Sequence, residues 1–151
     1  MLAYPYATVP AGPTELATIT ALVVQEFPIE VIVGLPRSLS GGEGPAAVKN
    51  RARAVALAAA LARSAPSVTV RLIDERLTTV TASRQLRESG RRVKDQRSVI
   101  DAAAAVTILE HALAAERARG EAPGELVSAP ELPDQPARSA GGTETEPGDP
   151  L

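Results

Sequence analysis

The sequence predicts an α/β domain built on a parallel β–α–β unit, and three observations support this prediction. Two short runs of β-branched and apolar residues, 29–33 and 68–73, are typical of buried strands. Between them, the alanine-rich segment 45–63 repeats small apolar residues at helical spacing and starts with Pro45 in its first turn. A helix that links two such strands places them parallel, in a right-handed crossover.

The flanking segments extend this pattern. Residues 1–9 contain Pro5, which limits them to an edge strand or an extended arm. Apolar residues at helical spacing predict helices over 14–27, 96–118 and, after the second strand, about 78–88. Residues 120–151 are rich in Pro, Gly, Glu and Ser, and we expect a disordered acidic tail after a single domain over 1–119.

Composition excludes several classes of protein. The chain has no cysteine and one histidine, which rules out disulfides, thiolate metal sites and a histidine-based zinc site. No apolar run reaches the roughly 18 residues of a membrane span, and no signal-peptide pattern is present. Residues 1–117 carry 14 Lys/Arg against 11 Asp/Glu, whereas 118–151 carry 2 against 7. We therefore expect a cytoplasmic protein with no membrane partner, a mildly basic domain and an acidic tail.

Charged residues follow the second predicted strand directly. Asp74, Glu75 and Arg76 come immediately after residues 68–73. In open α/β sheets, ligands bind beyond the carboxyl ends of the strands, so this acid pair lies where chemistry would take place. The alternative is a solvated turn with a local ion pair, and the local pattern favours neither.

Three motifs carry a resemblance to a known family. They are Val-Ile-Val-Gly-Leu-Pro (31–36), Asp-Glu-Arg-Leu-Thr-Thr (74–79) and Val-Ile-Asp-Ala-Ala-Ala-Ala-Val-Thr-Ile-Leu (99–109). In this order and spacing they resemble the YqgF/RuvX family over about residues 2–117. The resemblance implies an RNase H-like, RuvC-like mixed sheet flanked by helices. It also implies an endonuclease that matures the 5′ end of pre-16S ribosomal RNA, resolves Holliday junctions, or both.

The resemblance further implies a metal site. Carboxylates would hold Mg²⁺ or Mn²⁺, hard cations that prefer oxygen ligands and can stabilise both the attacking and the leaving oxygen of a phosphodiester. It assigns catalytic roles to Asp74, Glu75 and Asp101, with Glu75 and Asp101 as metal ligands. An alternative for Asp101 is helix capping, because Ser98 precedes it at the spacing of a capping box.

Basic and hydroxyl residues complete the implied site. Arg76 with Thr78 or Thr79 would orient the acids or contact the scissile phosphate, unless Arg76 only pairs with Asp74. Residues 84–97 hold six basic residues against two acidic ones, and Arg91 with Arg92 are the candidate contacts to nucleic acid. The alternative for this segment is a solvated loop, because no aromatic residue interleaves with the charges to stack on bases.

The start of the chain departs from the family pattern. The family begins with a strand that carries Gly-x-Asp-x-Gly, and nothing similar precedes Leu2. The resemblance therefore implies a sheet that lacks its first two strands, an unpaired strand edge and a missing catalytic Asp. From this we expect an upstream in-frame extension and an inactive short form. The partners expected are precursor rRNA or branched DNA, and a homodimer is compatible with this function. The alternative function is a catalytically inactive nucleic-acid-binding fragment.

Overall fold

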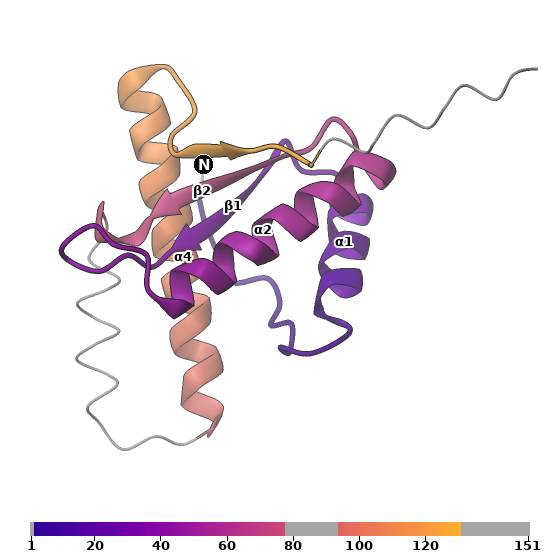
Figure 1. Ribbon diagram of the computed structural model, residues 1–151, viewed down its shortest axis with the longest axis horizontal. Coiled ribbons are helices and arrows are strands. Elements are labelled where there is room, and N and C mark those ends of the chain that lie inside the picture. Colours follow the sequence, from indigo (N-terminus) through magenta and orange to yellow (C-terminus); the bar gives the residue numbers. More distant parts are fainter. Residues whose placement is uncertain (1, 78–93, 131–151) are drawn as a thin grey trace, which may run out of the picture.

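The structure, a computed structural model, describes residues 2–77 and 94–130. A three-stranded sheet crosses the molecule with helices on both sides (Figure 1). No helix within these ranges is long and apolar enough to cross a membrane. The elements, in chain order, are α1 (Glu15–Glu26), β1 (Glu30–Leu35), α2 (Pro45–Ser64), β2 (Thr69–Asp74), the short 3₁₀ helix η1 (Glu75–Leu77), α4 (Lys94–Arg119) and β3 (Glu125–Val127).

The predicted parallel β–α–β unit is confirmed. Strands β1 and β2 pair in parallel over six residues each, from Glu30 opposite Thr69 to Leu35 opposite Asp74. Helix α2 connects them and begins at Pro45, as its first-turn proline predicts. The sheet is mixed, with strand order β1-β2-β3, because β3 joins β2 in the antiparallel direction.

Alternation along the strands divides the apolar side chains between two cores. Val33 and Leu35 of β1 and Leu72 of β2 face α1 and α2, in the larger core. Ile32 and Ile73 face the opposite side and pack against Ala104, Ile108 and Ala112 of α4. Because successive strand residues point to opposite faces, both faces of the sheet are covered, and the continuous apolar runs of β1 and β2 follow from this.

The predicted disordered tail is wrong for residues 120–130. Residues 125–127 form β3, with Val127 opposite Val70 and Glu125 opposite Leu72. Val127 packs against the larger core, and Glu125 accepts a hydrogen bond of 2.7 Å from Arg51 Nη1. This strand depends on partners more than 50 positions away in the sequence, which local composition does not reveal. Residues 131–151, the rest of the predicted tail, lie outside the described residues.

The N-terminal segment forms an arm and not an edge strand, which were the two alternatives predicted for it. Residues 2–10 contain no strand, although Ala3 is buried. In the part of the chain that the structure describes, β1 pairs with β2 alone, so its other edge has no neighbouring strand. Ile29, just before β1, is 91% exposed.

Candidate active site at the end of strand β2

The two acids that follow one another at the end of β2 lie on opposite sides of the sheet. Asp74 continues the alternation of Leu72, which faces α2, and Glu75 continues that of Ile73, which faces α4. Their environments differ accordingly. Glu75 is 3% exposed, the one buried charged residue among those described, whereas Asp74 is half-buried. The two carboxylates therefore lie in separate environments on opposite faces of the sheet.

A missing side chain makes the room for the Glu75 carboxylate. A Cβ placed on Gly34 of β1 would lie 2.5 Å from Glu75 Oε1 and 2.8 Å from Ile108 Cδ1, distances that real Cβ atoms do not show. Glu75 therefore lies over the Gly34 backbone, beside Ile108 of α4. On the other side, Asn50 of α2 donates a hydrogen bond of 3.0 Å from Nδ2 to the Gly34 carbonyl oxygen. The end of β1 is held in place from both layers.

Asp74 forms a compact ion pair with Arg76. Its carboxylate accepts the backbone N–H of Arg76 at 2.9 Å and also accepts hydrogen bonds from Nε and Nη2, the latter at 2.6 Å. These bonds, the side-chain ones first, hold the pKa of the Asp74 carboxyl below its ordinary value of 3.8, while burial opposes them. The sequence alternative, that Arg76 pairs with Asp74, is thus what the structure contains.

Asp101 lies on the helix that covers Glu75. Residues 101, 104 and 108 share one face of α4 through their spacing of three and four, and Ala104 and Ile108 from this face are buried against the sheet. Asp101 is exposed, about 10 Å along the helix axis from Ile108. Helix α4 already begins at Lys94, so Ser98 lies within it and cannot be its N-cap. The capping alternative for Asp101 is therefore wrong.

Four of the predicted site residues lie outside the described residues: Thr78, Thr79, Arg91 and Arg92. Within the described ranges, no three His, Cys, Asp or Glu residues gather closely enough to hold a metal ion.

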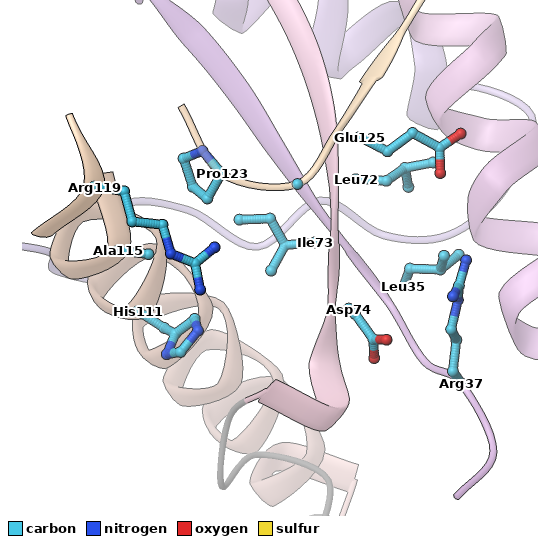
Figure 2. Close-up of a pocket in the computed structure, with 11 residues that line it drawn as sticks. Leu35, Arg37, Leu72, Ile73, Asp74, His111, Ala115, Arg119, Pro123 and Glu125 are labelled. Atoms are coloured by element: carbon cyan, nitrogen blue, oxygen red, sulfur yellow. The ribbon is translucent and has the colours of Figure 1, made fainter. Parts of the chain in front are cut away.

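Three residues at the site were missed by the sequence analysis. Gly34 and Asn50 act through contacts between β1 and other layers, and Arg37, in the loop after β1, lies on the same side of β2 as Asp74 (Figure 2). Arg37 also lowers the pKa of Asp74, as the smallest of the causes. Gly34 belongs to the first motif and Arg37 directly follows it. Both lie near the end of a predicted strand, and this position was the signal available in the sequence.

Comparisons with known proteins identify the family and several relatives of this chain. A family model described as "RuvX: Holliday junction resolvase" matches residues 1–115. A protein of Streptomyces avermitilis named "Putative pre-16S rRNA nuclease" is 57% identical over 129 residues, which cover 84% of this chain and 80% of that protein. A protein of the same name from Streptomyces coelicolor is 54% identical, over 84% of this chain and 75% of that protein. Another, from Thermobifida fusca, is 50% identical, over 84% of this chain and 82% of that protein.

Proposed function

The chain belongs to the RuvX family, and from this premise we propose that it is an endonuclease that hydrolyses phosphodiesters in the 5′ maturation of pre-16S rRNA. Resolution of Holliday junctions is the related activity suggested by the family description. An RNase H-like fold for the whole domain and a cytoplasmic location belong to the same proposal. The observation that supports it best is the buried carboxylate of Glu75 at the end of a parallel strand, under the helix that carries Asp101.

A divalent cation is part of the proposal, because both candidate ligands, Glu75 and Asp101, are carboxylates. Mg²⁺ is commonly bound through one or two carboxylates, with water and substrate phosphates filling the other positions. Glu75 and Asp101 would hold Mg²⁺ or Mn²⁺ from two elements that pack against each other. Such an ion supplies charge stabilisation at the phosphate and lowers the pKa of bound water.

The remaining residues would position the strand to be cut. Asp74 engages Nε and Nη2 of Arg76 and so fixes the guanidinium plane. Arg76 Nη1 has no hydrogen-bond partner among the described residues and points toward the loop at Gly41. Its N–H groups are available to phosphate oxygens, which a guanidinium binds well. In this role Asp74 is a positioning residue for Arg76.

The decisive experiment compares cleavage by matched acid variants. Full-length chain is incubated with a precursor 16S rRNA fragment and with a four-way DNA junction, with Mg²⁺, with Mn²⁺ and with EDTA. Glu75→Gln and Asp101→Asn should each lower the cleavage rate by about 100-fold or more, because a cation ligand is lost. Glu110→Gln is the control, since Glu110 is another exposed acid of α4 outside the site.

A second candidate function is a nucleic-acid-binding protein that does not cut. It is favoured by the absence, within the described ranges, of a group of three acids. Binding of either substrate without cleavage in any metal would support this second function and refute the nuclease. Cleavage that Glu75→Gln and Asp101→Asn leave intact would also refute the site, because the activity would come from elsewhere.

A further inference from the structure

A cavity of 210 Å³ lies along the edge of β2 that β3 leaves uncovered, and Asp74 and Arg37 belong both to its lining and to the acid site. Figure 2 shows Arg119 and His111 of α4 on one side of β2 and Arg37 on the other, with Ile73 and Asp74 between them. We propose that this cavity is an anion subsite that holds one backbone phosphodiester of the nucleic-acid strand, next to the acid site. The identity of the anion rests on the proposed function.

The charges around the cavity leave an excess of guanidinium. Both acids in its lining are already paired, Asp74 with Arg76 and Glu125 with Arg51 at 2.7 Å. Arg119 makes no ion pair within the described ranges. The charged lining residues and their ion-pair partners together comprise four guanidiniums and three carboxylates. The guanidiniums are those of Arg37, Arg51, Arg76 and Arg119, and the carboxylates are those of Glu43, Asp74 and Glu125. A bound anion would balance this excess.

Arg37 supplies the most direct sign of a missing acceptor. Its Nε is buried and has no hydrogen-bond partner among the described residues, and a buried donor of this kind calls for one. Within the described ranges, its one ion pair is a contact of 3.4 Å from Nη2 to Glu43, whose carboxylate is already engaged by Arg51 at 2.5 Å. A phosphate oxygen would satisfy the guanidinium, whose planar fork matches phosphate geometry.

The other wall of the cavity is formed by α4 and by the chain that turns back toward β2 after it. His111, Ala115 and Arg119 recur every four residues and form one stripe of α4. After Arg119 the chain turns at Gly120 with φ of +73°, and Gly124 follows with φ of +81°. A Cβ on Gly124 would collide with the carbonyl oxygen of Leu72, so only glycine lets the chain approach β2 this closely.

The size of the cavity favours one phosphate group over a whole ligand. Its volume is below the roughly 300–1,000 Å³ of typical small-molecule sites. A nucleic-acid strand would therefore pass over the cavity and place one phosphodiester between Arg37 and Arg119. Asp74 lines the cavity and also holds Arg76, so the next part of that strand would reach the acid site.

The single histidine of the chain makes the test specific. His111 lines the cavity, so one set of imidazole NMR signals reports on it without ambiguity. The full-length chain is titrated with dimethyl phosphate, and separately with a single-stranded RNA oligonucleotide in EDTA. We expect saturable shifts of the His111 signals in the wild type, their loss in Arg119→Gln, and their retention in Arg117→Gln. Arg117 is the matched control, an exposed arginine in the same helical turn that does not line this cavity.

Affinity for the same RNA gives the second readout. Loss of one phosphate contact should make the slope of log affinity against log salt shallower by about 0.7 in Arg119→Gln and leave Arg117→Gln at the wild-type value. If the wild type binds and cleaves RNA but Arg119→Gln changes neither the slope nor the His111 signals, the subsite is refuted and the proposed function stands. If the wild type binds no nucleic acid, the proposed function fails. Shifts caused by dimethyl phosphate that depend on Arg119 would then still establish an anion site.

Discussion

Replacing Gly34 by alanine tests whether the absence of a side chain makes room for the buried carboxylate. The new Cβ would lie 2.5 Å from Glu75 Oε1 and 2.8 Å from Ile108 Cδ1. Overpacking of this kind costs about 1–3 kcal/mol, and alanine recovers about 0.5–1 kcal/mol over glycine within a strand. The net loss of stability is then about 0–2.5 kcal/mol. At about 4 °C per kcal/mol, the melting temperature should fall by up to about 10 °C.

Activity should fall further than stability in this variant. The added methyl group displaces the Glu75 carboxylate, and we expect a cleavage rate lowered by about tenfold or more, at a temperature where the protein remains folded. Calorimetry and the rRNA cleavage assay measure the two effects. Gly42→Ala is the control, because a Cβ there meets only Ser38 Oγ at 3.4 Å.

A second variant separates the two contacts at Gly34. Ile108→Val removes the Cδ1 atom, so Gly34→Ala should cost less stability in that background than in the wild type, while the cleavage defect due to Glu75 remains. Unchanged melting temperature and unchanged cleavage in Gly34→Ala would refute the close packing of Glu75 on β1.

Three more outcomes are expected. Truncation after residue 119 should lower the free energy of unfolding by about 2 kcal/mol, because it removes β3 with its ladder hydrogen bonds and its apolar contact. Truncation after residue 130 retains β3 and is the control. Equal urea midpoints for the two truncated chains would contradict this expectation. The lowered pKa of Asp74 means that its ion pair stabilises the fold above pH 3.8 and that this stabilisation is lost as the pH falls through the folded-state pKa. Urea unfolding between pH 6 and pH 2.5 should therefore show a shallower acid loss in Arg76→Gln, and an identical loss would exclude the pair as its cause. Replacing Arg91 and Arg92 by alanine should flatten the salt dependence of nucleic-acid affinity, and an unchanged slope would make this segment a solvated loop.

Much of the framework could be predicted from local sequence. The apolar runs of β1 and β2, the alanine-rich α2 and its Pro45 start are short-range patterns, and a helical crossover between two strands leaves parallel pairing as the natural solution. The position of the acid pair after β2 could also be predicted, because the apolar run that indicates a strand also indicates where the strand ends, and ligands bind at such ends in α/β sheets. These features depend on neighbours a few positions apart.

The details of the site depended on contacts between distant parts of the chain. Alternation alone separates Asp74 from Glu75, but only the packing of α4 shows which acid is buried and that Gly34 gives it room. Strand β3 was missed because three residues in a polar segment gain their stability from β2 and from Arg51, not from their own composition.

The proposed anion subsite also depends on contacts between distant parts of the chain. Arg37, His111 and Arg119 are unremarkable one by one in the sequence, and they line one cavity only because the sheet edge and two glycine turns bring them together. Sequence by itself determined which segments form helices and strands and which strand end carries the acids, because propensity and periodicity act locally. Tertiary structure decided which charges are buried, paired or left without an acceptor, because burial and pairing are set by residues that meet only when the chain folds.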